Sequence, residues 1–235
     1  MLEVFTYWDQ TDTSPINKFK NHWIDQGYKL HIIGDDEVLS IVEEHFPQFI
    51  DRYSNISIPA CRSDLARILG LYRYGGLYVD SHCGVVDKAK FDSLYDKLGG
   101  YKLILARQSS RVIKPGAPPQ ITNAIIFARR GYEVLLNVAR SIISNLDRHH
   151  DREVEFGFMP YNILDLSGPV NIENCLFDAG KTHPKVHTKF NDEILVVNEE
   201  DLPVKRYKYP TKLTQSRHWS ERQKTELLFG LGKVI

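Results

Sequence analysis

The stretch Ala60–Val86, with the sequence ACRSDLARILGLYRYGGLYVDSHCGVV, decides the fold of this chain. Its first part predicts a helix over Pro59–Tyr74, because its apolar residues recur at helical spacing. The core-facing set is Leu65, Ile68, Leu69 and Tyr72. Gly75-Gly76 supplies the left-handed conformation that ends a helix. Leu77–Val79 then predicts a short buried strand, so the stretch indicates one unit of an α/β sheet.

The polar residues Asp80-Ser81-His82 follow this strand directly. Ligands of open α/β sheets bind just beyond the carboxyl ends of the strands. A carboxylate suits Mg²⁺ or Mn²⁺, and a nearby imidazole favours Mn²⁺ or another transition metal. On the preceding helix, Asp64 and Arg67 are three residues apart and share a face. They form either a structural ion pair or part of a ligand site.

The rest of the chain predicts further strands and helices around this unit. In the first half, we expect strands at Leu2–Trp8 and Lys29–Ile33 and helices over Pro15–Gln26, capped by Ser14, and Asp35–His45. In the second half, we expect strands at Leu103–Ala106, Ala124–Ala128 and Ile194–Val197 and a helix over Gly131–Arg148, with His149-His150 at its polar end. The alternation predicts one α/β domain over residues 1–235, built on a mostly parallel sheet.

Composition narrows the function. The 30 Lys and Arg balance 30 Asp and Glu, which argues against a dedicated nucleic-acid binder. Three cysteines without CxxC spacing indicate neither a disulfide framework nor a zinc cluster, so we expect a reducing, cytoplasmic setting. Because the first residues already predict a strand, we expect no leader peptide. No apolar run in the sequence reaches membrane-spanning length.

Charge is concentrated toward the end of the chain. Residues Pro203–Ile235 hold eight basic and two acidic residues, a net charge of +6. This basic tail is either an ordinary solvated surface or a contact for an anionic partner. The anionic partner would be a diphosphate or the inner face of a membrane.

The central motif resembles a known family. The pattern S-D-x-x-R-x-x-x-L-x-x-x-G-G-x-Y-x-D is that of the DXD-containing glycosyltransferases of family thirty-two. Here it is carried by Ser63-Asp64, Arg67, Leu71, Gly75-Gly76, Tyr78 and Asp80. Weaker similarities lie at Trp8, Trp23 with Tyr28, Asp35-Asp36, Asn123, Gly168-Pro169 and His218-Trp219.

The resemblance implies a GT-A fold and a metal-dependent, retaining glycosyltransferase. Residues 1–100 would mainly bind the nucleotide-sugar, and residues 101–235 would supply the acceptor side and a basic C-terminal lid. The expected reaction moves a hexose or N-acetylhexosamine from a UDP-sugar to a glycan or lipid-linked acceptor, in bacterial capsule or lipopolysaccharide synthesis. The alternatives are a protein-modifying transferase, as in the toxin relatives, and a non-catalytic domain that binds nucleotide-sugars or glycans.

The same resemblance implies roles for individual residues. Asp64, Arg67 and Asp80 are the expected catalytic residues, with Asp64 and Arg67 on the donor sugar and phosphate. Asp80 would also hold the nucleotide and the metal ion, Mn²⁺ or Mg²⁺. The remaining donor contacts are expected from Trp8, Tyr78, Asn123 and Trp219, the first two by packing on the nucleotide.

One position departs from the family pattern, because His82 stands where the motif normally has Asp. Either metal binding has decayed, or His82 is itself a ligand. We favour the ligand, because polypeptide N-acetylgalactosaminyltransferases have a similar Asp-x-His motif. His218 is then the expected downstream ligand, and His183 and His187 are weaker candidates. Asp165 and Glu173 are expected to be surface charges rather than a carboxylate beneath the sugar.

Overall fold

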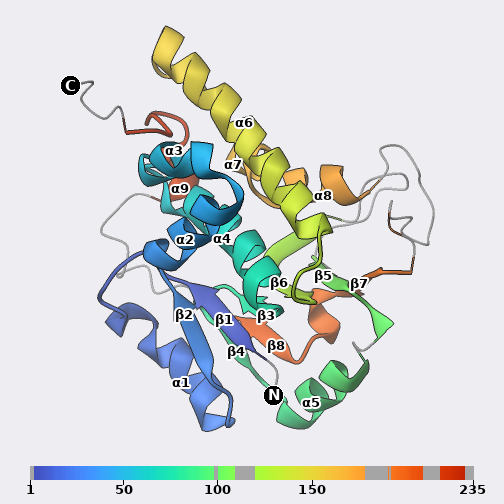
Figure 1. The fold of residues 1–235 in the computed structure, drawn as a ribbon. Helices are drawn as coiled ribbons and strands as arrows, with labels where there is room; N and C mark the ends of the chain where they lie inside the picture. Colours follow the sequence, from blue (N-terminus) through green and yellow to red (C-terminus); the bar gives the residue numbers. More distant parts are fainter. Residues whose placement is uncertain are drawn as a thin grey trace.

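The computed structural model describes residues 3–97, 100–108, 120–177, 190, 192–208 and 218–230, without the side chains of residues 94–97. Its centre is a six-stranded sheet in the order β2-β1-β3-β6-β5-β7 (Figure 1). The strands are β1 (Val4–Tyr7), β2 (Leu30–Ile33), β3 (Gly76–Val79), β5 (Leu103–Arg107), β6 (Ile121–Ala128) and β7 (Ile194–Asn198). Strand β6 runs antiparallel to both of its neighbours, and the other pairs are parallel. The predicted α/β class, with a mostly parallel sheet, is confirmed.

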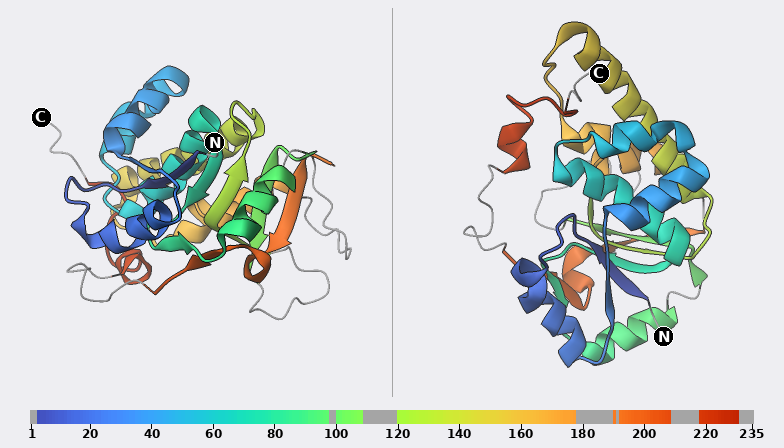
Figure 2. Two further views of the ribbon diagram at one scale, coloured as in Figure 1. Left: turned by 90° about the horizontal axis from the view of Figure 1, so that it is seen from below. Right: turned by 60° about the vertical axis from the view of Figure 1, so that its left-hand side comes forward.

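Helices cover both faces of the sheet (Figures 1 and 2). On one face lie α2 (Asp35–His45), α3 (Ile50–Ser54), α4 (Pro59–Tyr74), α6 (Val134–Phe156), α7 (Ile163–Leu166) and α8 (Pro169–Leu176). On the other face lie α1 (Asn17–Asp25), α5 (Lys88–Lys97) and a two-stranded sheet of β4 (Cys83–Val85) and β8 (Val204–Arg206). The short helix α9 (Trp219–Arg222) follows β8 in the chain.

Alternation along the strands produces two apolar cores. In β1, Phe5 packs with the α4 and α6 side of the sheet, whereas Val4 packs with the α1 and α5 side. In β3, Tyr78 and Leu77 divide in the same way. Successive strand residues point to opposite faces, so each strand contributes to both cores.

The helix α4 has the predicted bounds, and the turn after it depends on glycine. Gly75 and Gly76 have φ values of 66° and 87°, in the left-handed region that disfavours other residues. A Cβ atom on Gly76 would also lie 2.2 Å from the carbonyl oxygen of Glu3. The close approach lets β3 begin immediately beside β1.

Several local predictions are wrong. Ser14 does not cap α1, because a 3₁₀ turn over Ser14–Ile16 precedes the helix and the Asp12 carboxylate accepts from the Ser14 amide at 2.8 Å. The helix α6 continues to Phe156, eight residues past the predicted end at Arg148. His149 is therefore buried rather than part of a polar helix end.

The sequence also did not predict the strands β4 and β8 or the helices α3, α5, α7, α8 and α9. None of the described helices combines the length and the apolar character needed to cross a bilayer.

Candidate functional site

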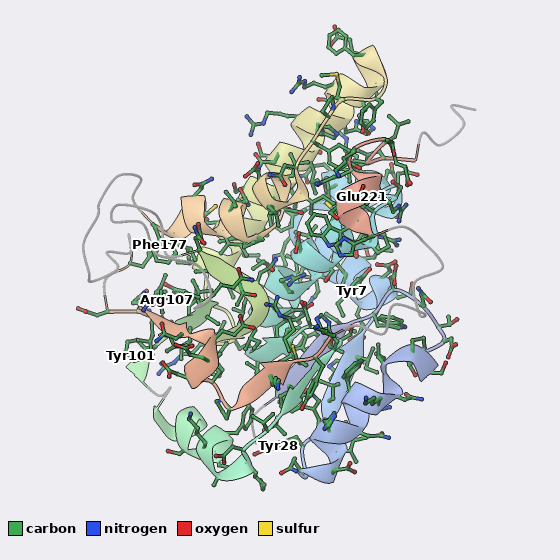
Figure 3. All side chains as sticks on the ribbon, turned by 180° about the vertical axis from the view of Figure 1, so that it is seen from behind. Tyr7, Tyr28, Tyr101, Arg107, Phe177 and Glu221 are labelled. Atoms are coloured by element: carbon green, nitrogen blue, oxygen red, sulfur yellow. The ribbon has the colours of Figure 1, made fainter. Side chains whose placement is uncertain are left out.

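The candidate site lies at the carboxyl end of the parallel strands. Strand β3 ends just before Asp80, and the antiparallel β6 brings Asn123, near its beginning, to the same edge, with the Asp80 amide donating to Ala124 at 2.8 Å. The first half of α4 supplies Asp64 and Arg67. In Figure 3, Tyr7 at the end of β1 lies on the side of Glu221 in α9, whereas Tyr28 before β2 lies at the opposite end.

Arg67 is the centre of this site, and its side chain is only 6% exposed. Its guanidinium lies 2.9 Å from the Asp64 carboxylate in an ion pair and donates to Asp80 Oδ1 at 3.2 Å. It also donates to the Asn123 carbonyl at 2.5 Å, the Ser63 hydroxyl at 2.9 Å and the Ser63 carbonyl at 3.2 Å. The protein thus engages this guanidinium through four hydrogen bonds and one further ion pair. Arg67 thus holds the two carboxylates in place and supplies a fixed positive charge.

Asp64 is equally enclosed. Its Oδ1 accepts from Asn123 Nδ2 at 2.7 Å, and its Oδ2 accepts from the Ser167 hydroxyl at 2.8 Å. Burial raises the pKa of Asp64 to about 6, although the charge of Arg67 and these hydrogen bonds oppose the shift. The predicted i,i+3 pair exists, and it is part of a larger network that joins α4, β3, β6 and the turn before α8.

Tyr78 contacts both Asp80 and Arg67 of this network. Its hydroxyl donates to Asp80 Oδ1 at 3.1 Å, and the Arg67 guanidinium lies 4.9 Å from the ring centroid. Phe5 packs edge-on against the same ring at 5.5 Å. The side chain is 1% exposed, so the ring is covered in this arrangement and its packing on a nucleotide stays a prediction. The buried ring positions Arg67 and Asp80.

Asp80 and His82 occupy the turn between β3 and β4, which is closed by the Cys83 amide donating to the Asp80 carbonyl at 2.9 Å. Asp80 is 23% exposed at its side chain, more than Asp64 or Arg67. Burial lowers the pKa of His82, although Asp80 opposes the shift, so the neutral imidazole is favoured. Cys83 is buried on the other side of the chain, as the alternation predicted.

The charges of the site sum to −1, because Arg67 neutralises only one of Asp64 and Asp80. A carboxylate and a neutral imidazole are suitable ligands for Mn²⁺, so the types of the donor groups at Asp80 and His82 fit a divalent ion. Among the described residues, no three His, Cys, Asp or Glu side chains are arranged to hold a metal ion. Any ion here would need further ligands from outside this pair.

The expected third ligand, His218, has a different local partner. Its Nδ1 is hydrogen-bonded to the Ser220 hydroxyl at 2.8 Å and accepts from the Ser220 amide, so it caps α9. The role of His218 as a metal ligand stays a prediction, because in this arrangement its ring nitrogen contacts Ser220 instead. The weaker candidates His183 and His187 lie outside the described residues.

The two tryptophans predicted at the donor site are both among the described residues. Trp8 follows β1, and its indole donates to the Asp12 carbonyl at 2.9 Å. Trp219 begins α9 and packs partly against the main core. Their contacts with a donor stay predictions. The basic tail falls partly outside the described residues, which include 203–208 and 218–230 of it.

Sequence reasoning missed the serine that closes the network. Ser167 is fully buried and donates to Asp64, and only its place before the Gly168-Pro169 turn could have pointed to it. Glu173 is also buried and accepts from the Ile121 amide, so its expected surface position is wrong, whereas Asp165 is exposed. Glu173 fixes the start of β6 and with it the position of Asn123.

A second network lies beside the first at the ends of β1 and β2. The Asp35 carboxylate accepts from the hydroxyls of Tyr7 at 2.6 Å and Tyr53 at 2.8 Å, and from Arg62 at 2.5 Å. Arg62 also lies 3.6 Å from Asp9. Burial and the Asp35 carboxylate together raise the pKa of Tyr7, so this hydroxyl stays protonated. The network ties the start of α4 to the strands that precede it.

Comparisons with known proteins agree with the motif. Residues 16–102 match the family model described as a glycosyltransferase sugar-binding region containing a DXD motif. This span includes Asp64, Arg67, Tyr78, Asp80 and His82, and it confirms the resemblance seen in the sequence.

One curated relative is the mannosyl phosphorylinositol ceramide synthase SUR1 of Saccharomyces cerevisiae. It is 25% identical over 144 residues, which are 61% of this chain and 32% of the yeast protein. The chain thus spans about a third of the length of this relative.

Among solved structures, the chain is similar to the PaToxG glycosyltransferase. The TM-score is 0.49 and the identity 15%, over 74% of this chain and 68% of that one. It is also similar to a glycosyltransferase involved in glycosylation of the major capsid of PBCV-1, with a TM-score of 0.37 and 12% identity over 83% and 81% of the two chains.

Proposed function

We propose that this protein is a metal-dependent glycosyltransferase that takes a sugar from a nucleotide-sugar donor. The observation that carries the proposal is the buried network of Asp64, Arg67, Asp80 and Asn123 at the carboxyl edge of an α/β sheet. The family match over residues 16–102 supports the same activity. We further propose a UDP-sugar as donor, a GT-A type of fold, and retention of configuration at the sugar.

The site would favour the transition state through charge that is fixed before the reaction begins. As the bond between sugar and diphosphate breaks, negative charge develops on the leaving group. Groups that are held in place need no reorganisation at that moment, so they stabilise the transition state more than groups free to move. Arg67 has its orientation set by five contacts and contributes a fixed positive charge of this kind.

The site itself carries a net negative charge, which would repel a diphosphate. A divalent ion bound between Asp80, His82 and the diphosphate would supply the missing positive charge. The role proposed for Asp80 is to present a carboxylate to that ion, and the hydrogen bonds from Arg67 and Tyr78 to Oδ1 fix its direction. The role proposed for His82 is to present a neutral ring nitrogen.

Release of sugar from UDP-glucose and UDP-N-acetylglucosamine in solution, with and without Mn²⁺, tests the activity without needing an acceptor. We expect hydrolysis that requires Mn²⁺ and that falls about 10²–10³-fold in Asp80→Asn, the loss typical of a fixed electrostatic contact. His82→Ala should weaken the dependence on Mn²⁺. The exposed Asp25→Asn in α1 is the matched control and should keep full activity.

Two outcomes would contradict the proposal. Hydrolysis that is equal in Asp80→Asn and the parent protein would remove Asp80 from the reaction. Binding of UDP-sugars without any turnover, in the presence of Mn²⁺ and candidate acceptors, would instead favour a non-catalytic binding domain.

For the acceptor, we propose a glycan or a lipid-linked molecule. The name of the yeast relative, a synthase of a mannosylated phosphorylinositol ceramide, favours the lipid-linked class. A role in bacterial surface-polysaccharide synthesis, at the cytoplasmic face of a membrane, is the setting that we propose for this acceptor.

A further inference from the structure

The C-terminal end of α6 projects beyond the rest of the molecule (Figure 1). Apolar side chains at this end and just after it are exposed. Phe156 is 62% exposed at the end of α6, Phe158 is 38% exposed after it, and Leu164 of α7 is 37% exposed. Val154, on the other side of the helix, is 62% exposed. Of the six exposed large apolar side chains in the described residues, four therefore lie within eleven consecutive positions. Such a gathering marks an interaction surface rather than scattered exposure.

A cavity of about 270 Å³ lies along the same helix, α6. It is lined by Asn145, Arg148, His149, Arg152 and Leu166. Arg148, Arg152 and Phe156 follow at four-residue intervals, so both arginines and the phenylalanine lie along one side of α6. The apolar end of the helix and the basic cavity are thus parts of one surface.

The two arginines of the cavity have no acidic partner among the described residues. Arg148 donates to Asn145 Oδ1 at 2.5 Å and to the Ser144 carbonyl, which are neutral acceptors. The nearby Asp147 and Asp151 are instead engaged by Arg52 of α3, at 2.5 Å and 3.1 Å. An arginine pair beside a cavity is suited to a phosphate group, which accepts several N–H bonds at once.

We propose that this surface, which we call the α6–α7 surface, docks on a phospholipid bilayer. Phe156, Phe158 and Leu164 would enter the region between head groups and acyl chains, and the cavity between Arg148 and Arg152 would take a head-group phosphate. Amphipathic helices with aromatic and basic residues bind membranes in this way, without crossing them. The exposed acids Glu155 and Asp165 do not line the cavity, so they leave the phosphate position unopposed.

Helix α7 connects the α6–α7 surface to the candidate site through the chain. Helix α7 begins at Ile163 and leads within one turn to Ser167, whose hydroxyl donates to Asp64. A lipid-linked acceptor lying in the same bilayer would therefore meet the site from the α7 side. This part of the inference rests on the proposed function, whereas docking on the bilayer does not.

Flotation with vesicles tests the docking directly. The vesicles are made of phosphatidylcholine alone, or of phosphatidylcholine with phosphatidylglycerol. We expect the full chain to float with both kinds, and more strongly with the second. The double variant Phe156→Ser/Phe158→Ser should bind about tenfold more weakly or worse, from the loss of buried apolar area. Arg148→Gln and Arg152→Gln should each weaken binding about fivefold.

Matched controls lie elsewhere on the molecule. Ile24→Ser removes an equally exposed apolar side chain from α1, and Arg140→Gln removes an exposed arginine from the beginning of α6. Both should bind vesicles like the parent chain. Unchanged thermal unfolding of every variant shows that a loss of binding does not reflect misfolding.

The outcomes separate this inference from the proposed function. Equal flotation of the parent chain and the double phenylalanine variant, or no flotation of either, would overturn the docking. Binding of inorganic phosphate to the parent chain, with no flotation on either kind of vesicle, would identify a phosphate site without a membrane surface and would also overturn it. Hydrolysis of the UDP-sugar in solution reports on the candidate site alone, so the docking variants should keep it.

Discussion

At the scale of single residues, the site is organised around one guanidinium that makes four hydrogen bonds and a further ion pair within the protein. Arg67 could not be replaced by lysine without loss, because an ammonium group has three donors and no planar fork. Its partners Ser63, Asp64, Asp80 and Asn123 come from a helix, a turn and an antiparallel strand. For Arg67 to contact the donor phosphate directly, as expected from the motif, it would have to give up one of these contacts within the protein. The structure instead favours action through charge and through the positions of the two carboxylates.

The pKa of Asp64 predicts a pH dependence of activity. As pH falls through about 6, Asp64 takes up a proton and loses its ion pair with Arg67, which also orients Asp80. We expect kcat/KM for donor hydrolysis to fall about tenfold for each pH unit below 6. In Asp64→Asn, kcat/KM should be lower at every pH and should no longer fall as the pH drops below 6. If the same fall below pH 6 persists in Asp64→Asn, another titrating group causes it.

The raised pKa of Asp64 predicts the opposite pH dependence for stability, which should increase where activity falls. The folded protein binds the Asp64 proton near pH 6, whereas an unfolded chain binds it near its ordinary value of 3.8. Between these values the folded state carries more bound protons, so the Asp64 contribution to the free energy of unfolding rises as pH falls from 6 toward 4. The parent protein should therefore gain stability relative to Asp64→Asn over this interval, as measured by thermal unfolding at each pH.

At the scale of elements, the end of the described chain is held by a buried carboxylate. Glu153 of α6 is 1% exposed and accepts from the amides of Leu228 at 2.8 Å and Phe229 at 3.0 Å. His149 lies 3.0 Å from the same carboxylate. On the other side, Ser57 donates its hydroxyl to the carbonyls of Leu227 and Leu228. The segment after α9 is thus fastened to α6 and to the residues that precede α4.

This anchor predicts a specific loss of stability. Glu153→Leu keeps an apolar side chain in the core but leaves two backbone amides without an acceptor, at a cost of about 2–4 kcal/mol. We expect a melting temperature roughly 5–15 °C lower, with faster hydrogen exchange at residues 227–229. Glu155→Leu, at an exposed position on the same helix, is the control and should change neither. Equal exchange in the two variants would show that Glu153 does not hold the segment.

At the scale of the whole molecule, the fold gathers acidic groups at one edge. Asp64 and Asp80 share Arg67, and Asp9 and Asp35 share Arg62, so each network retains one net negative charge. All four carboxylates lie at or near the carboxyl end of the parallel strands, where this class of sheet binds its ligands. The field at this edge favours a cation, and a diphosphate would bind together with one.

This charge balance predicts coupled binding of metal and donor. Mn²⁺ with UDP at about 100 times its dissociation constant should stabilise the protein by about 2.7 kcal/mol, which raises the melting temperature by roughly 5–10 °C. UDP with EDTA should give a much smaller shift, and Asp80→Asn should abolish the effect of Mn²⁺. A full shift with UDP and EDTA would show that the diphosphate binds without a cation.

The sequence by itself determined the central unit of this protein. The bounds of α4, the glycine turn and strand β3 follow from local rules, because periodicity, backbone freedom and strand propensity act over a few residues. The motif also named Asp64, Arg67 and Asp80 as a group. The motif is only 18 residues long, so the helix and the following turn lie close together with little help from the rest of the chain.

Only the tertiary structure decided which of these groups are buried and which remain accessible. Ser167 contacts α4 and Glu173 contacts β6, although both residues lie far from these elements in the sequence. No local sequence pattern predicts such contacts. Tyr78 is buried for the same reason, since burial depends on what the remaining chain places over a ring. Exposure, and with it the pKa of Asp64, is a property of packing between segments far apart in the sequence.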